Sequence, residues 1–486
     1  MKFNQYLWSL YKQSPDGQAA ISSFAKRKDY MDDVCLLEKY NPKIKDQFNT
    51  DAICNVLESV WCYKVSEYEK EVNTLEDAAS LYEEMVSTGW VEKEIIIKPG
   101  NYNEMLDLVM FLSLNLSYKY GGFFFPYLYI DEFYHLQKLA DYFEIELPQI
   151  PKKADYKGRC MYYWELCKVF YIFRIENNLT LHELCAFMYD YAPKRINEEE
   201  QTEMPQPSSA WFIGGRIEGY GDKWTTGFWQ SNKETKRGDI LVHYETSPIS
   251  AITCMWIAQT DGVIDPFFHY YSNTYIGGKI DIPHITLKEL QEDKYFSSHP
   301  LVRKNFQGVN GWALSGEDYS KLLRMIKDKG GDILSLPPIY APTTPKGLEI
   351  KHESDVEAKL LKPLLNSMGW HEGTDFIRQL PIHAGRGHRI FPDFALHYNN
   401  KPDEEKAKVL IEAKLYMKSN QDVDQAFLQA FSYAKLLESS VIVLCDKVCL
   451  IVYEKKEGFS RSRYKKYYWE NMNNPDTFKE LKNKLE

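Results

Sequence analysis

The segment GGDILSLPPIYAPTTPKG, residues 330–347, limits the fold more than any other part of this 486-residue chain. Proline inside a helix removes a hydrogen bond and clashes with the preceding turn, so a helix cannot continue through this segment. The chain is also too long for one compact hydrophobic core. Together these features predict a linker over residues 331–347 and separate domains on either side of it.

The remaining segments predict a multidomain α+β protein. Residues 1–204 carry apolar side chains at helical spacing, and Thr180 and Glu183 have the spacing of a capping box. A polar, proline-containing break then leads into residues 205–330, where short apolar runs separated by Gly, Asp and Pro predict strands. Residues 348–486 begin with a helical pattern and continue with strands and a second helix. We therefore expect a helical domain followed by two domains that contain sheets.

The formal net charge of −10 lies almost entirely in the first domain. Residues 1–204 contain 22 Lys and Arg against 33 Asp and Glu, a balance of −11. The balance is zero over residues 205–346 and +1 over residues 347–486. A locally neutral domain can still bind phosphate through a clustered patch, so the global charge does not exclude a nucleic-acid partner. The acidic helical domain is expected to act as a scaffold, an oligomerisation module or a sensor.

Several absences narrow the class of protein. The nine cysteines include no CxxC pair, which argues against a disulfide framework and against a zinc ribbon. The N-terminus lacks the pattern of a signal peptide, and no apolar run reaches the ~20 residues of a membrane span. No GxxxxGK[ST] motif is present, so we expect no ATP site. A cytoplasmic protein without a membrane partner is the expectation.

Charged residues interrupt two apolar stretches near the C-terminus, in RIFPDFALHYNNKPDEEKAKVLIEAKLY (389–416). Because side chains alternate along a strand, Glu412 and Lys414 share the face opposite to Val409 and Ile411. The loop-like NNKPDEEKA between the stretches predicts two antiparallel neighbouring strands, which would bring Asp393 beside Glu412 and Lys414.

Two carboxylates at close range repel each other unless a cation lies between them. Oxygen ligands of this kind suit Mg²⁺, and Mn²⁺ is an expected substitute. A neighbouring lysine could orient the attacking water or stabilise charge that develops on a phosphate group. Asp393, Glu412 and Lys414 therefore predict a site for phosphodiester hydrolysis.

These residues resemble the PD-(D/E)xK nucleases, with Pro392-Asp393 and Glu412-Ala413-Lys414 as the motif. The resemblance implies a restriction-endonuclease-like α/β domain with Asp393 and Glu412 as metal ligands. In that family a glutamate on the preceding helix often completes the site. Glu357 is the favoured candidate here, and Glu353, one turn earlier, remains the alternative.

The helical segment DQAFLQAFSYAKLLES extends the resemblance to the RecB-like branch and to nuclease domains of type I restriction subunits. Gln429 and Tyr433 match the QxxxY motif of that branch, which implies that they support the site or contact the DNA backbone. In the run GRGHR (385–389), Arg386 and Arg389 are expected to contact phosphates.

Residues 209–328 resemble the EVE domain of the PUA-like superfamily, a β-barrel related to the YTH fold. The likeness rests on AWFIGG, on KETKRGDILVHYETSP and on the later HPLVRKNFQGVNGWALSGEDYSKLL. It implies a reader of modified bases that holds a flipped base among aromatic side chains. Trp211, Trp229 and Trp256 are the expected walls of that binding site.

A base reader linked to a Mg²⁺-dependent nuclease resembles a modification-dependent, type IV restriction endonuclease of anti-phage defence. The expected substrate is double-stranded DNA with modified bases, cut near the base that is read. A double-strand break needs two active sites or two visits by one site, which leaves room for a homodimer. The alternatives are a recognition protein that does not cleave and a nuclease subunit that requires a partner.

Overall fold

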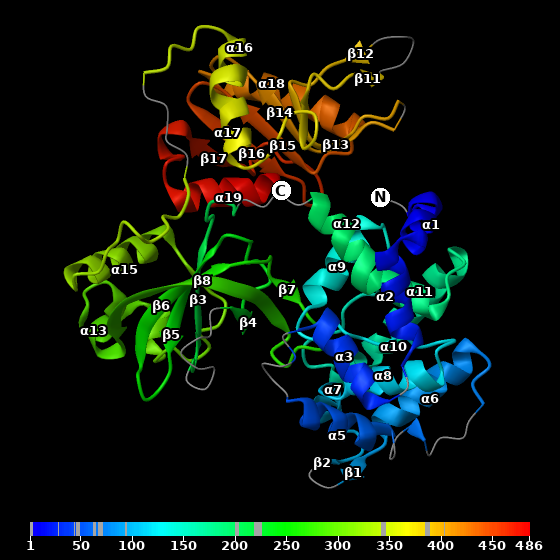
Figure 1. Cartoon of the computed structure of the whole chain (residues 1–486). Coiled ribbons are helices and arrows are strands. Elements are labelled where there is room, and N and C mark those ends of the chain that lie inside the picture. Colours follow the sequence, from blue (N-terminus) through cyan, green and yellow to red (C-terminus); the bar gives the residue numbers. More distant parts are fainter. Residues whose placement is uncertain are drawn as a thin grey trace. The chain divides into compact units, whose positions relative to one another are not determined.

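The computed structural model describes residues 3–27, 29–42, 44, 49–61, 65–66, 71–92, 95–199, 204–217, 226–341, 347–383, 389–402 and 404–486 (Figure 1). The chain forms two compact units. The first contains Met1–Pro205 and Trp211–Trp312, and the second contains Gln206–Ala210 and Ala313–Glu486. Within the described part of the chain, no helix has both the length and the apolar character needed to cross a bilayer.

The first half of unit 1 is helical, as predicted, and its helices enclose a large aromatic core that includes Trp8, Tyr82 and Tyr163. The predicted capping box is present, since the Thr180 side chain accepts a hydrogen bond from the Glu183 backbone N–H. A short hairpin of β1 (Trp90–Glu92) and β2 (Ile95–Ile97) accompanies the helices. The helices are α1 (Gln5–Gln13), α2 (Pro15–Ala25), α3 (Tyr30–Tyr40), α5 (Thr50–Val60), α6 (Leu75–Ser87), α7 (Tyr102–Leu106), α8 (Val109–Lys119), α9 (Phe133–Tyr142), α10 (Tyr156–Glu176), α11 (Leu181–Ala186), the π-helical turn η2 (Phe187–Tyr191) and α12 (Ala192–Glu199).

The strands predicted after residue 205 form one sheet, in the order β4-β8-β6-β5-β3-β9, with β7 paired to β8. The adjacent pairs β4–β8, β8–β6 and β6–β5 are antiparallel, and the β5–β6 and β6–β8 pairs contain register shifts that bend the sheet. The strands are β3 (Ala210–Gly215), β4 (Gly227–Gln230), β5 (Ile240–Glu245), β6 (Ala251–Ala258), β7 (Val263–Ile264), β8 (Ser272–Thr286) and β9 (Trp312–Leu314); the helices α13 (Leu287–Glu292), η3 (Phe296–Ser298) and α14 (Pro300–Arg303) follow β8.

A buried arginine connects helix α10 to a loop of the sheet in unit 1. Arg159 on α10 has no exposed surface, and its guanidinium donates hydrogen bonds to the backbone carbonyls of Pro266 (2.8 Å) and Phe268 (2.6 Å). A third hydrogen bond goes to the carbonyl of Lys153 (3.1 Å). These bonds join α10 to the loop that follows β7, and they use donors on all three guanidinium nitrogens.

Unit 2 contains a six-stranded sheet in the order β10-β13-β14-β15-β16-β17, drawn from yellow to red in Figure 1. Only the β14–β15 pair is parallel. The strands are β10 (Phe376–Arg378), β13 (Phe394–Asn399), β14 (Lys406–Ala413), β15 (Val441–Cys445), β16 (Cys449–Glu454) and β17 (Lys465–Tyr468), with a separate pair of β11 (Ile382–His383) and β12 (Arg389–Ile390). The helices are α15 (Gly316–Asp328), α16 (Glu353–Val356), the π-helical turn η4 (Glu357–Leu361), α17 (Lys362–Ser367), α18 (Asn420–Leu436), η5 (Trp469–Asn471) and α19 (Pro475–Leu485).

Helices cover both faces of this sheet. One face packs against residues of α16, η4, α17 and α19, including Val356, Leu361 and Phe478. The other face packs against α18 through residues such as Phe427 and Ala430. The sheet is therefore the middle layer of an α/β sandwich, and strand β14 is buried on both of its faces.

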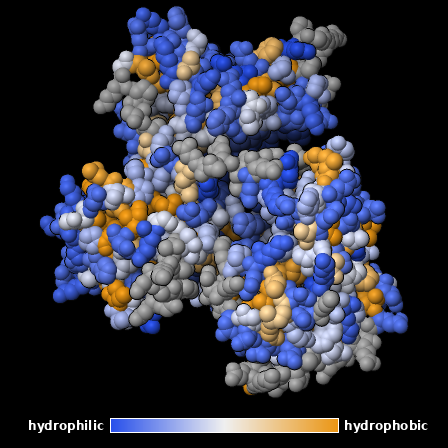
Figure 2. Space-filling model, in the orientation of Figure 1, coloured by the Kyte–Doolittle hydropathy of each residue, from blue (hydrophilic) through white to orange (hydrophobic). Residues whose placement is uncertain are grey.

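The prediction of a mixed α and β fold is confirmed. Residues 331–341 of the predicted linker contain neither helix nor strand, whereas residues 342–346 lie outside the described residues. On the face shown in Figure 2, hydrophilic side chains cover much of the described surface between scattered apolar patches. The division into three domains, with a barrel-like reader in the middle, stays a prediction.

Replacement of Arg159 tests the contribution of its buried hydrogen bonds. Arg159→Met leaves three carbonyl groups without their charged donor, so we expect the free energy of unfolding to fall by about 3–5 kcal/mol. Lys168→Met on the same helix is the matched control, because the Lys168 side chain is 39% exposed and pairs with Glu165 of its own helix. The control should lose less than about 0.5 kcal/mol. Thermal and urea unfolding of both variants measure the difference. Equal stability of the two variants would contradict the claim that the buried hydrogen bonds of Arg159 stabilise unit 1.

Candidate active site

Strands β13 and β14 position the predicted carboxylates. They pair antiparallel, as predicted, with Phe394 opposite Ile411 and Ala395 opposite Leu410. Continuing this register by one residue places Asp393 opposite Glu412. Val409, Ile411 and Ala413 pack into one core and Leu410 into the core under α18, so Glu412 lies on the α18 side of the sheet.

Hydrogen bonds hold these side chains in place. Asp393 Oδ2 accepts a hydrogen bond from the Ala413 backbone N–H (2.7 Å), which ties the end of one strand to the other. Lys414 Nζ donates to Glu412 Oε1 at 2.7 Å. Glu412 is only 1% exposed, and its second carboxylate oxygen, Oε2, is buried without a hydrogen-bond partner among the described residues. A carboxylate oxygen in this state costs free energy unless another group satisfies it.

The helix before the sheet brings both candidate glutamates toward this group. Glu353 Oε1 lies 3.8 Å from Lys414 Nζ. Glu357 begins the π-helical turn η4 and is half-buried. Single π-helical turns inside helices are frequent at functional sites. The two glutamates therefore differ in their surroundings, since Glu353 is exposed and paired with lysine whereas Glu357 is partly buried.

Burial dominates the electrostatics of the group. Burial raises the pKa of Glu412 to about 7, and the negative charge of Asp393 adds to this effect, while Lys414 opposes it. Burial also raises the pKa of Asp393. Glu357 has a raised pKa for the same reason, with Asp393 as the next contribution. The pKa values of all three carboxyl groups are thus raised above their ordinary values, because the groups share a poorly solvated region.

The residues present are compatible with a magnesium ion. The structure places no three His, Cys, Asp or Glu side chains close enough to form a ready-made metal cluster within the residues it describes. Mg²⁺ nevertheless keeps several waters and requires only one or two protein carboxylates. The unsatisfied Oε2 of Glu412 and the raised pKa values of Glu412 and Asp393 are the features that a bound cation would relieve.

The accessory residues of the candidate site lie on α18 and β12. Gln429 is exposed and Tyr433 is half-buried, and Gln429 Nε2 donates a 3.4 Å hydrogen bond to Tyr433 Oη. Their common helical face is as predicted, and helix α18 packs against β14. Arg389 is exposed at the start of β12, whereas Arg386 lies outside the described residues.

The expected aromatic walls of the reader are placed mostly in the core of the middle sheet. Trp211 is 2% exposed and donates from Nε1 to Asp239 Oδ2 (2.9 Å), and Trp256 is fully buried. Both belong to one apolar cluster, so neither offers a ring face to a base in this structure. Trp229 is half-buried and packs at the edge of that cluster against His243, with 5.2 Å between ring centroids. Of the three, only Trp229 keeps a surface that could contact a ligand.

A group of cations and aromatic side chains in unit 1 was not predictable from any local sequence pattern. Lys138, Arg237 and Tyr275 line one cavity there, although they come from three separate elements. No local motif connects them, because only the tertiary fold brings them together.

Comparisons with known proteins add little. No protein-family description matches the chain, and no curated protein matches it either. Among solved structures, the NMR structure of Rpa0253 from Rhodopseudomonas palustris matches at 12% identity, covers 24% of this chain and 93% of its own, and has a TM-score of 0.22. A likeness at that TM-score supports no inference about this chain.

The raised pKa of Glu412 predicts a pH-dependent stability effect. The folded state holds the Glu412 proton more tightly than the unfolded state, so this group's contribution to stability is lost as pH rises from about 4.5 to about 7. Glu412→Gln removes the ionisable group. Its effect on the free energy of unfolding should therefore be more stabilising at pH 8 than at pH 4, by about 2–3 kcal/mol. Urea unfolding in EDTA at the two pH values measures this difference.

Glu404→Gln is the matched control for this experiment, because Glu404 is exposed in the loop before the same strand. We expect its effect on the free energy of unfolding to be the same at both pH values within about 0.5 kcal/mol. A Glu412→Gln effect that does not change with pH would show that this carboxylate is not destabilised in the folded state.

Proposed function

We propose that this chain is a Mg²⁺-dependent endodeoxyribonuclease that hydrolyses phosphodiester bonds in DNA. The observation that carries the proposal is the buried Glu412, whose one carboxylate oxygen binds the Lys414 ammonium while the other has no partner among the described residues. A carboxylate is rarely buried in this way in a sheet unless it has a function, because an apolar side chain at the same position would be more stable. The resemblance to PD-(D/E)xK nucleases supports the same reading.

Asp393 and Glu412 would hold the magnesium ion, and Glu357 would complete the set. Glu357 suits this role better than Glu353, since its carboxyl group is half-buried and its pKa responds to Asp393, whereas Glu353 is engaged with Lys414. When bound, Mg²⁺ would polarise a phosphate oxygen and neutralise charge on it.

Lys414 is the residue of this chain that would act on the attacking water. Its ammonium is half-buried and held by Glu412 at 2.7 Å, which fixes its direction. A fixed donor of this kind can orient the water and stabilise negative charge that develops in the transition state. Gln429 and Tyr433 on α18 would support the site or contact the DNA backbone.

We further propose a three-domain arrangement in which the middle sheet reads a modified base and thereby raises the local concentration of the nuclease near it. Trp229 is the aromatic side chain that supports this part of the proposal, because it is only half-buried. The substrate would then be double-stranded DNA with modified bases, and the biological role would be restriction of foreign DNA.

A recognition protein that binds modified DNA without cutting it is the second candidate. The buried positions of Trp211 and Trp256 count against the base reader of both candidates alike, so they do not decide between a cutting and a non-cutting protein. A nuclease subunit that requires a partner is the third candidate, and it predicts binding without cleavage by the isolated chain.

Cleavage of matched DNA duplexes tests the proposal. We expect cutting in the presence of Mg²⁺, with preference for one of the duplexes that carry methylated, hydroxymethylated or glucosylated cytosine over the unmodified duplex. Asp393→Asn and Lys414→Met should each lower the cleavage rate at least about 100-fold, since each removes a group that acts on the reacting phosphate. Gel electrophoresis of end-labelled duplexes gives the rates.

Lys406→Met is the matched control for Lys414→Met. Lys406 begins β14, the strand that ends just before Lys414; it is exposed and pairs with Glu438 at 2.7 Å. Its replacement should leave the rate within about twofold. The nuclease proposal would be contradicted if Asp393→Asn still cleaves DNA, or if the unchanged protein cleaves none of the duplexes. Equal cutting of all duplexes would contradict only the proposal that the middle sheet reads a modified base.

A further inference from the structure

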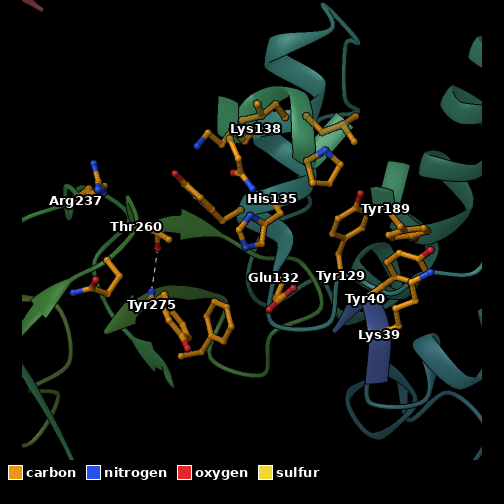
Figure 3. A pocket seen from close by; sticks show the side chains of 17 residues that line it. Lys39, Tyr40, Tyr129, Glu132, His135, Lys138, Tyr189, Arg237, Thr260 and Tyr275 are labelled. Atoms are coloured by element: carbon orange, nitrogen blue, oxygen red, sulfur yellow. Dashed lines mark hydrogen bonds between the residues drawn. The ribbon is translucent and has the colours of Figure 1, made fainter. Parts of the chain in front are cut away.

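Unit 1 contains a cavity of about 470 Å³ that the proposed nuclease does not use. Pockets of 300–1,000 Å³ are typical of small-molecule sites. The lining residues come from both the helical part and the sheet of this unit, and from segments as far apart as α3, α9 and β8. Figure 3 shows Arg237, Thr260 and Tyr275 on one side of the cavity and Tyr40, Tyr129 and Tyr189 on the other, with His135 between them.

Aromatic rings form a large part of the lining, and hydrogen bonds fix two of them. Tyr129 and Tyr189 lie 4.8 Å apart between ring centroids, and Tyr189 and Tyr40 lie 5.9 Å apart. Tyr129 Oη donates to the Met188 carbonyl (2.7 Å), and Tyr189 Oη donates to the Pro126 carbonyl (2.5 Å). Because backbone groups hold these hydroxyls, the rings are positioned before any ligand arrives.

On the sheet side, Phe228 and Tyr275 add a second aromatic pair, with ring centroids 5.0 Å apart. Tyr275 is held at two points, since its backbone N–H donates to Thr260 Oγ1 (3.1 Å) and its hydroxyl donates to Thr226 Oγ1 (2.9 Å). A planar ligand could therefore contact aromatic rings from two sides of the cavity.

The cations of the lining outnumber its carboxylate. Lys39, Lys138 and Arg237 line the cavity together with one acidic residue, Glu132. Burial and the neighbouring Arg237 guanidinium both lower the pKa of the Lys138 ammonium, while Asp261 acts in the opposite direction. Lys138 and Arg237 thus act on each other in a partly desolvated place, and a phosphate group in the cavity would face both cations.

We propose that this cavity binds a nucleotide, with its phosphate at Lys138 and Arg237 and its base against the half-buried ring of Tyr40, which packs against the buried ring of Tyr189. Stacking on aromatic side chains and pairing of phosphate with cations are the two interactions that nucleotides combine in protein sites. The ligand is either a free nucleotide or one nucleotide of a single DNA strand, since the two share this chemistry.

Equilibrium binding to the full-length protein tests the proposal. The probes are the four deoxynucleoside monophosphates and a 12-nucleotide single-stranded DNA, measured by isothermal titration calorimetry in EDTA. We expect saturable binding of at least one monophosphate. Lys138→Gln and Arg237→Gln should each weaken it at least tenfold, because each removes a cation from the phosphate. Tyr40→Leu should weaken it by a smaller factor through loss of stacking.

Lys236→Gln is the matched control. Lys236 precedes Arg237 in the chain, is exposed, and is not part of the lining. Its replacement should leave the affinity within about twofold, and unfolding curves without ligand verify that all variants are folded.

Competition separates the two sources of the ligand. Displacement of the bound monophosphate by the 12-nucleotide strand would identify a strand-binding site, and binding of the monophosphate without such displacement would identify a site for free nucleotides. The proposal is overturned if neither probe binds, if inorganic phosphate binds as tightly as the monophosphates, or if the Lys138 and Arg237 variants bind like Lys236→Gln. Because the assay contains no Mg²⁺ and the cavity contains none of the nuclease residues, failure here leaves the nuclease proposal standing.

Discussion

The candidate active site depends on one ion pair, between the buried Glu412 carboxylate and the half-buried Lys414 ammonium. Strand β14 carries Glu412 and ends one residue before Lys414; it lies between an antiparallel and a parallel neighbour and is covered by helices on both sides. The fold therefore holds Glu412 at a fixed place in a poorly solvated environment, where its pKa is raised to about 7. A charged group in that place reduces stability at neutral pH, which is the expected trade between stability and a prearranged site.

Much of this site could be predicted from the sequence because strand geometry is regular. Alternation along β14 separates Glu412 from Val409 and Ile411, and the antiparallel pairing brings Asp393 opposite Glu412. The choice between Glu353 and Glu357 could not be predicted. It depends on how a helix with a π-helical turn packs, and only the structure shows that Glu353 contacts Lys414.

The reader walls could not be predicted for a different reason. Strands β5 and β6 are buried along almost their whole length, so alternation does not distinguish a core side from a ligand side. Trp256 on β6 and Trp211 on β3 consequently belong to the core, where Trp211 binds Asp239. The cavity lined by Lys138 and Arg237 could not be predicted from the sequence either, because its residues share no motif and come together only through the packing of unit 1.

The most direct test of the central claim is a crystal structure with Mn²⁺ in place of Mg²⁺, recorded at a wavelength where manganese scatters anomalously. We expect an anomalous peak bound by Asp393 and Glu412, with Glu357 as the third carboxylate. A structure at saturating Mn²⁺ without a peak at these residues, and with Glu412 still bound only to Lys414, would contradict the assignment of a metal-dependent nuclease site.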